Sequence, residues 1–361
     1  MKPLLRLFEK VGPTFQKGGK LGFFEPVFEA MENFFFAPST TTVTAPHVRD
    51  PLDVKRLMSM VIIAIVPCLL ASFYFFGLRF LVMIAVSYAA GGTVEVIFAI
   101  VRKEKINEGL LVTGMLFPLI LPPGLPLWMV AVGVAFGVFV GKELFGGTGR
   151  NIFNPALVGR CFLVLAYPAS MSSSWIKPSR EMAGGLFRYI DASSVDAVTV
   201  ATPLVLAKQG NMVSLSHMFL GSISGSVAET SAIAIILGGV FLLCTRVANW
   251  RTVVSILGSF VLLAGILHYA DEKFGPALWH LCAGGLLFGA FFMATDPVTS
   301  PITNTGKWFY GIIIGTTTVL IRNFTGYVEG VTFAILLGNI VAPILDEIVF
   351  NVRIRRLRSE G

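Results

Sequence analysis

The chain has 361 residues, of which 55% are hydrophobic and only 14% charged, and its mean hydropathy is +0.77. A water-soluble domain of this composition would expose large apolar patches, so an ordinary soluble enzyme is excluded and an integral membrane protein is favoured. The formal net charge of +7 is concentrated in the N-terminal segment, one early loop and the C-terminal tail. This clustering is typical of cytoplasmic loops and does not indicate a nucleic-acid partner.

Residues 1–55 form a polar and aromatic segment without an uninterrupted apolar core, so we expect no signal peptide and a cytoplasmic N-terminal segment. The apolar runs beyond it are long enough to cross a hydrocarbon core of roughly 30 Å. They predict an all-α polytopic membrane domain over 56–350, with about ten transmembrane helices. The predicted spans are 57–77, 80–101, 109–126, 127–144, 155–171, 231–246, 252–270, 276–295, 307–322 and 330–349.

The distribution of basic residues predicts the topology. With the N-terminus inside, the basic stretches at 102–105, 142–160 and 246–251 all face the cytoplasm, as does the basic tail 351–361. Both termini are therefore expected on the cytoplasmic side of a bacterial inner membrane. The segment at about 172–230 is then the one long segment on the outer face.

Two stretches resemble one unit used twice: Gly109 to Pro123 and Gly285 to Pro297 both run from a Gly-Leu-Leu sequence through phenylalanine to a proline. Five spans in each half would place these units in opposite orientations, which predicts a five-plus-five inverted repeat with interrupted helices around a site near the bilayer midplane. The alternative is chance similarity between helices that are rich in glycine and leucine.

The sequence Gly146-Gly147-Thr148-Gly149-Arg150-Asn151-Ile152-Phe153-Asn154-Pro155 lies between two predicted spans. Its glycines, two asparagines and a helix start at proline offer backbone N–H groups and amide side chains that can hold a polar heteroaromatic ring. The alternative is an ordinary tight turn with an asparagine cap. The loop is neither a P-loop nor a dinucleotide fingerprint, so it predicts neither a nucleoside-triphosphate site nor a dinucleotide site.

Two carboxylates, Glu95 and Asp296, lie inside or at the end of apolar segments. Ionisable groups at that depth favour a role in cation or proton transfer or in ligand binding, although each side chain can also reach a nearby interface. The four cysteines have no CxxC spacing and predict neither disulfides nor a metal site. No nucleophile or general acid is expected.

Taken together, these residues resemble the family that unites the B-type membrane subunit of sodium-translocating NADH:quinone oxidoreductases (Nqr) with the D-type subunit of Rnf complexes. The most specific likenesses are His47 to Arg56, Asn107-Glu108-Gly109, Gly146 to Arg160 and Phe291 to Val298. The resemblance covers essentially the whole chain. It implies a redox subunit that passes electrons through flavins to quinone, coupled to Na⁺ transport, among the other subunits of a complex.

The resemblance also implies the cofactors. A separate flavin transferase links FMN through a phosphodiester to a threonine that matches Thr202, in a stretch whose composition alone indicates only a β-prone segment. Such a site must be exposed on the outer face. A non-covalent riboflavin maps onto Thr113, Asn151 and Asn154. Quinone contacts map onto Gly91, Gly92 and the N-terminal segment, and cation-linked carboxylates onto Glu95 and Asp296.

Two alternatives remain open. At Val200 the quinone-reductase branch commonly has glycine, whereas the Rnf branch tolerates a bulky apolar residue; the N-terminal extension and the loop at 150–157 favour the former. A subunit of the Rnf branch would serve a ferredoxin:NAD oxidoreductase. A flavin-free solute transporter would also suit an inverted repeat with broken helices, but it has no use for the flavin stretch.

Overall fold

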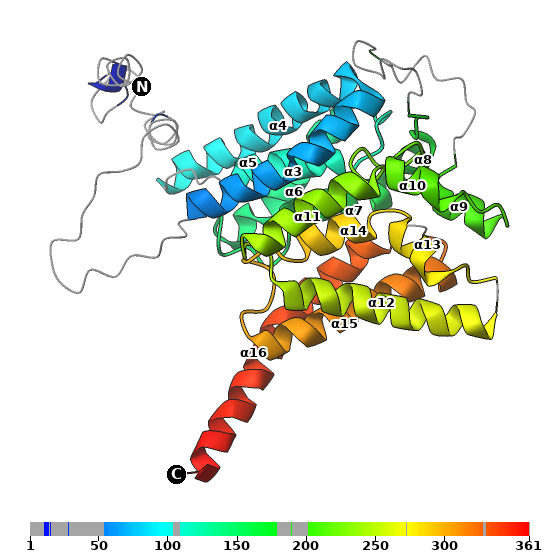
Figure 1. Cartoon of the computed structure of the whole chain (residues 1–361). Helices are drawn as coiled ribbons and strands as arrows, with labels where there is room; N and C mark the ends of the chain where they lie inside the picture. Colours follow the sequence, from blue (N-terminus) through cyan, green and yellow to red (C-terminus); the bar gives the residue numbers. More distant parts are fainter. Residues whose placement is uncertain are drawn as a thin grey trace.

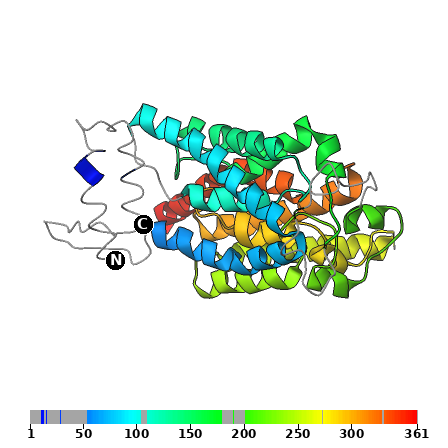
Figure 2. The same cartoon turned by 90° about the horizontal axis from the view of Figure 1, so that it is seen from above.

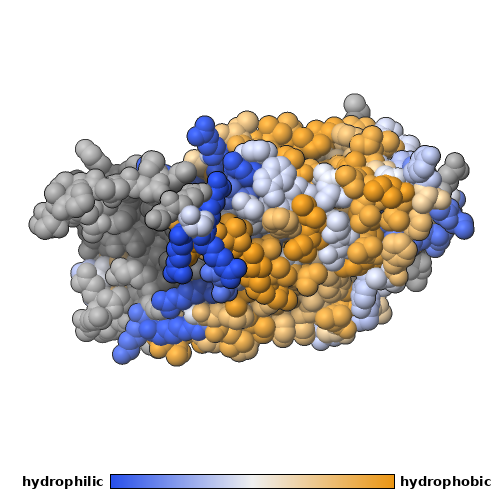
Figure 3. Space-filling view, turned by 90° about the horizontal axis from the view of Figure 1, so that it is seen from below, coloured by the Kyte–Doolittle hydropathy of each residue, from blue (hydrophilic) through white to orange (hydrophobic). Residues whose placement is uncertain are grey.

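The computed structural model describes residues 11–13, 15, 28, 54–103, 109–178, 189, 201–271, 273–327 and 330–360. Throughout this part the regular structure is helical and no strand occurs, which confirms the all-α prediction. Five helices in the described residues are long and apolar enough to cross a membrane, and three shorter apolar helices accompany them. Figure 3 shows the corresponding broad apolar belt on the surface, with hydrophilic residues toward its ends.

The first half of the membrane domain contains five helical segments in chain order (Figure 1). They are α3 (Val54–Phe76), α4 (Leu78–Arg102), α5 (Gly109–Leu119), α6 (Leu127–Gly141) and α7 (Pro155–Ala166). Between α6 and α7 lie a short 3₁₀ turn, η2 (Glu143–Phe145), and the glycine–asparagine loop.

The second half repeats this plan. Its segments are α11 (Ala232–Cys244), α12 (Trp250–Ala270), the broken span α13 (Ala277–Cys282), α14 (Leu286–Phe288) and η4 (Gly289–Met293, a π-helical turn), then α15 (Asn304–Phe324) and α16 (Val331–Glu360). α4 packs on α6 and α6 on α7, just as α12 packs on α15 and α15 on α16. Matched packing in two sets of five is what the predicted repeat requires.

The two predicted interrupted spans differ from continuous helices. The span expected at 109–126 is helical only to Leu119, and the span expected at 276–295 is divided into three pieces. Non-helical backbone at membrane depth must find partners within the protein. Arg79 supplies them in the first half, donating to the carbonyls of Pro123 (3.0 Å), Gly124 (3.3 Å) and Leu125 (3.0 Å).

Three short helices, α8 (Pro168–Ser173), α9 (Pro203–Lys208) and α10 (Leu215–Leu220), lie together at one end of the bundle (Figure 2). The start of α3 and the end of α16 lie at the opposite end. The basic tail, expected as a separate segment from residue 351, is a direct continuation of α16 as far as Glu360. Arginines on four of its positions keep this extension exposed.

Candidate functional site

The glycine–asparagine loop has the backbone that its composition predicts. Gly146, Gly147 and Gly149 adopt φ values of 107°, 89° and 91°, which side chains rarely tolerate. The Asn151 side chain ties the turn together, since its Oδ1 accepts from the Gly149 N–H at 3.2 Å and its Nδ2 donates to the Phe153 carbonyl at 3.0 Å. Asn154 caps α7 by accepting from the Ala156 N–H at 3.0 Å.

The three residues that were matched to riboflavin meet at one cavity. Thr113 comes from α5, Asn151 from the loop and Asn154 from the start of α7, and all three line it. The cavity has a volume of about 70 Å³ and is partly open to its surroundings. Its apolar wall comes from α3, α5, α11, the loop after α11 and η4: Leu57, Met58, Val61, Val112, Leu116, Leu242, Val247 and Phe292.

Thr148 gives this cavity an unsatisfied polar group. Its Oγ1 is buried without a hydrogen-bond partner in the described part of the chain, and the residue lines the cavity. A buried hydroxyl without a partner costs roughly 1–3 kcal/mol, so such groups call for a ligand or water. With the amides of Asn151 and Asn154 it forms a donor and acceptor set that suits the polar edge of a flavin ring. The ring needs the mouth of the cavity as well as its closed part.

Asp296 lies at the same cavity, three residues after the end of η4. Its Oδ2 accepts from the Thr299 hydroxyl at 3.0 Å, and its Oδ1 accepts from the Val298 N–H at 3.4 Å. Within the described residues no basic side chain forms an ion pair with it. The carboxyl group is therefore held in place by a local turn at the cavity.

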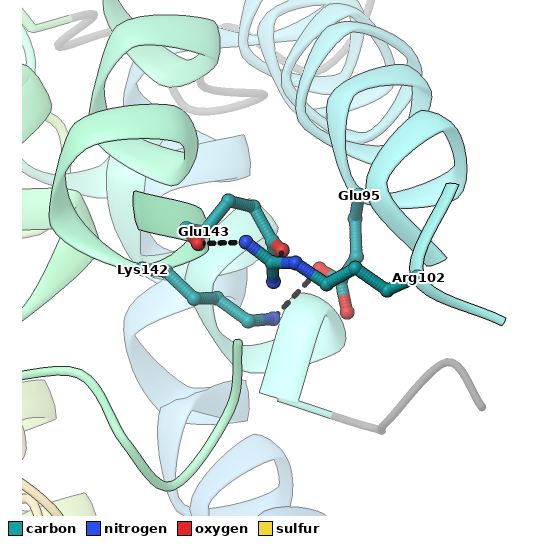
Figure 4. A network of polar contacts seen from close by, with 4 residues as sticks. All are labelled: Glu95, Arg102, Lys142 and Glu143. Atoms are coloured by element: carbon teal, nitrogen blue, oxygen red, sulfur yellow. Dashed lines mark hydrogen bonds and ion pairs between the residues drawn. The ribbon is translucent and has the colours of Figure 1, made fainter. Parts of the chain in front are cut away.

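Glu95, by contrast, is neutralised. The Lys142 Nζ lies 2.7 Å from Glu95 Oε2, and these two side chains are 4% and 5% exposed (Figure 4). A second pair adjoins it, between Arg102 Nη1 and Glu143 Oε2 at 3.0 Å. Lys142 also lines the cavity, whereas Glu95 does not. Sequence analysis missed this partnership, although a basic residue directly after an apolar span was the available signal.

Gly91 and Gly92 pack within the first half and do not line the cavity. A Cβ on Gly91 would lie 3.1 Å from Val134 Cγ2 of α6, and one on Gly92 would lie 3.5 Å from Leu110 Cδ2 of α5. The close approach of α6 to α4 therefore depends on glycine at Gly91, whereas a Cβ at Gly92 would make an ordinary contact.

Thr202 lies at the other end of the bundle, at the N-cap position of α9, and its side chain makes no capping hydrogen bond. It is only 6% exposed, so it is more covered than the resemblance implies. The segment from Asp196 to Val200, the stretch from His47 to Asp53, and Asn107 with Glu108 lie outside the described residues.

A further buried ion pair links α7 to the segment that precedes α11. Arg160 Nη1 of α7 lies 3.0 Å from Glu229 Oε1, and Arg160 Nη2 donates to the Ser226 hydroxyl at 3.3 Å. The pair sits beside the break in the second half, because a Cβ on Gly285 would collide with the Glu229 carboxylate. Sequence analysis did not single out either residue as a partner.

Comparison with known proteins gives a consistent family. Residues 41–355 match the NQR2, RnfD, RnfE family. The Na(+)-translocating NADH-quinone reductase subunit designated B of Azotobacter vinelandii is 38% identical over 98% of both chains. Proteins of the same name from Ectopseudomonas mendocina and Klebsiella pneumoniae are each 37% identical, over 96% and 99% of this chain and 97% and 100% of their own length. The chain therefore belongs to the NQR2, RnfD, RnfE family, and it is a multi-pass membrane protein.

Proposed function

We propose that the chain is the membrane-embedded redox subunit of a Na⁺-translocating NADH:quinone oxidoreductase, and that it passes electrons through covalent FMN and riboflavin to quinone. Its full-length similarity to relatives with that printed name supports the complex. The observation that carries the redox role is the meeting of Thr113, Asn151 and Asn154 at one cavity. Three separate elements supply them, which a simple capped turn would not require.

In this proposal the chain's own residues hold riboflavin in place. Asn151 and Asn154 are fixed by backbone hydrogen bonds, so their remaining amide groups and the Thr148 hydroxyl are oriented before the ligand arrives. Val61, Leu116 and Phe292 exclude water from the ring face. When bound, the flavin supplies the electron-transfer chemistry, and the protein orients it and tunes its surroundings.

The Thr202 hydroxyl would accept the FMN moiety of FAD through a phosphodiester bond, with AMP as the leaving group, in a reaction catalysed by a flavin transferase on the outer face. Its location at the start of α9, at the far end of the bundle from the end of α16, supports a site away from the riboflavin cavity. Because Thr202 is 6% exposed, the transferase must act while the start of α9 is uncovered.

Cation movement and quinone binding complete the proposal. Asp296 at the riboflavin cavity and Glu95 beside Lys142 are the carboxylates that we assign to Na⁺ coupling. Gly91 and Gly92 remain the assigned contacts for quinone, together with the N-terminal segment. The complex would lie in a bacterial inner membrane with both termini of this chain cytoplasmic, which the common location of the start of α3 and the end of α16 supports.

The runner-up is the D-type subunit of an Rnf-type ferredoxin:NAD oxidoreductase, which belongs to the same family and would keep both flavins. The names of the full-length relatives favour the quinone-reductase branch. Quinone reduction by the native complex would support that branch, and ferredoxin:NAD activity would reject it. A solute transporter without flavin is the least favoured interpretation, because it leaves the polar groups of the cavity unexplained.

In-gel flavin fluorescence of the denatured chain, expressed with its flavin transferase, tests the proposal. We expect a fluorescent band for the wild type and none for Thr202→Ala. If neither the wild type nor Thr202→Ala gives a fluorescent band while the transferase is active on another substrate, the covalent flavin is rejected and a transporter is favoured. The purified subunit should not oxidise NADH by itself, since NADH oxidation is assigned to another subunit.

A further inference from the structure

A second cavity lies beside α9, at the end of the bundle that carries Thr202. Its volume is about 180 Å³, and its lining includes the apolar side chains of Leu204, Ala207, Met212 and Phe274. Its basic lining residues are Lys208, Lys273, His280 and Arg322, of which Lys273 pairs with Asp271 at 3.6 Å. No aspartate or glutamate is among its lining residues. We call it the outer cationic cavity. Such a site suits a flat apolar ligand with an anionic edge.

Arg322 is the most unusual of these groups. The residue is 3% exposed at the end of α15, and one donor, Nη1, bonds the His280 carbonyl at 2.7 Å. Its Nε and Nη2 are buried and find no acceptor in the described part of the chain. Arg79, in the other half, shows what a purely structural arginine looks like here, because three backbone carbonyls accept from it.

The local charge is also unbalanced. Two buried guanidinium groups, of Arg160 and Arg322, interact electrostatically with the single carboxylate of Glu229. Arg160 Nη1 lies 3.0 Å from Glu229 Oε1, and Glu229 Oε2 has no hydrogen-bond partner among the described residues. The cluster therefore has a net positive charge next to the cavity, and besides Glu229 and the His280 carbonyl the Arg322 guanidinium faces the Phe260 ring, 5.3 Å from its centroid. A buried charge without a hydrogen-bonded partner is costly unless a ligand completes it.

The cavity and the attachment site are adjoining parts of one structure. Leu204 lies two residues after Thr202, and its Cδ1 would be 2.8 Å from a Cβ on Gly284. Arg322 Nη2 would be 3.3 Å from the same point. The Leu204 side chain and the Arg322 guanidinium thus both lie next to Gly284. Gly284 has a φ of 66° and lies in the break between α13 and α14.

We propose that the outer cationic cavity binds the ring of the FMN attached at Thr202, with Arg322 Nε and Nη2 donating to its N1–C2=O edge. This inference rests on the proposed covalent FMN. The apolar wall and the adjacent pair of N–H donors match a ring edge better than a phosphate alone, and the ribityl chain lets the ring lie away from Thr202. Negative charge gained at that edge on reduction is stabilised by Arg322, which raises the midpoint potential of the FMN.

The experiment compares midpoint potentials in the full chain expressed with flavin transferase. Subtracting the titration of Thr202→Ala isolates the covalent FMN from riboflavin. In Arg322→Gln we expect the equilibrium constant for two-electron reduction to fall at least tenfold, a shift of about 30 mV for such a couple. Arg322→Lys should retain most of the wild-type potential. As a control, Arg246→Gln removes an equal charge from an exposed position two residues after the C-terminal end of α11. It should leave the midpoint potential of the covalent FMN unchanged.

Unchanged potential in Arg322→Gln, with FMN still attached, would overturn the inference and leave the proposed function intact. Absence of flavin from wild-type Thr202 would instead reject both. If Arg322→Gln does not fold, the Lys208→Gln variant tests the inference instead. The Lys208 side chain is exposed, and within the described residues its Nζ bonds the Thr325 carbonyl alone, at 2.9 Å. Lys208→Gln should lower the midpoint potential of the covalent FMN, but by less than Arg322→Gln. An unchanged potential in Lys208→Gln would also overturn the inference.

Discussion

Lys142 and Glu95 form a 2.7 Å ion pair in which each side chain is about 95% buried, between the C-terminal end of α6 and the second half of α4. Lys142 at the same time lines the cavity that holds Asn151 and Asn154. One buried cation therefore connects the candidate flavin site with a carboxylate at membrane depth. A change in charge at the cavity would act on Glu95 through Lys142.

Removal of one partner of this pair should destabilise the protein strongly. Glu95→Gln or Lys142→Met leaves a lone buried charge, which typically costs about 3–5 kcal/mol. The double variant should recover much of that loss, because no unpaired charge remains. Thermal unfolding of the detergent-purified chain measures both effects. As a control, Lys273→Met breaks the exposed pair with Asp271, at 3.6 Å, and should cost less than about 1 kcal/mol. Additive effects of the two single changes would contradict a coupled pair.

Local patterns predicted the helical segments well, because length and apolarity alone define a membrane span. The glycine–asparagine loop and the interrupted spans were also recognisable, since Pro122, Pro123 and Gly285 interrupt otherwise apolar runs. The Lys142–Glu95 and Arg160–Glu229 ion pairs could not be recognised from the sequence. They join residues 47 and 69 positions apart, and only the packing of α4 on α6 and of the outer segment on α7 brings them together.

Asn154 should be required for riboflavin and not for covalent FMN. Asn154→Leu removes both the cap of α7 and an amide at the cavity, so we expect loss of acid-extractable riboflavin with an unchanged fluorescent band in gels. Loss of the cap by itself costs about 1 kcal/mol. Asn249→Leu is the matched control, because Asn249 caps α12 through the Arg251 N–H at 3.0 Å and does not line this cavity. Equal riboflavin loss in both variants would mean that only helix capping matters.

The α6–α7 contact should be needed to hold the cavity together. A Cβ on Gly159 would lie 2.5 Å from the Gly133 carbonyl oxygen, so Gly159→Ala must separate the two helices. Such overpacking costs about 1–3 kcal/mol and moves Asn154 away from Thr113. We expect a lower unfolding temperature and weaker riboflavin retention. Gly258→Ala provides the control, because no atom lies within 4 Å of its Cβ position and alanine favours a helix. Unaltered riboflavin retention in Gly159→Ala would contradict a cavity that depends on this contact.

Thr148→Val should separate the stability of the protein from its affinity for flavin. In the flavin-free chain the Thr148 hydroxyl is buried without a partner among the described residues, so replacing it with a methyl group of similar shape should leave the unfolding temperature unchanged or raise it. In the flavin-bound chain the same change removes a hydrogen-bonding group from the cavity and should weaken riboflavin binding about tenfold, since a hydrogen bond of about 1.4 kcal/mol corresponds to that factor. Differential unfolding with and without added riboflavin measures both effects. Lower stability of the flavin-free variant would show that the hydroxyl already has a partner, whereas unchanged riboflavin affinity would mean that the ring does not reach Thr148.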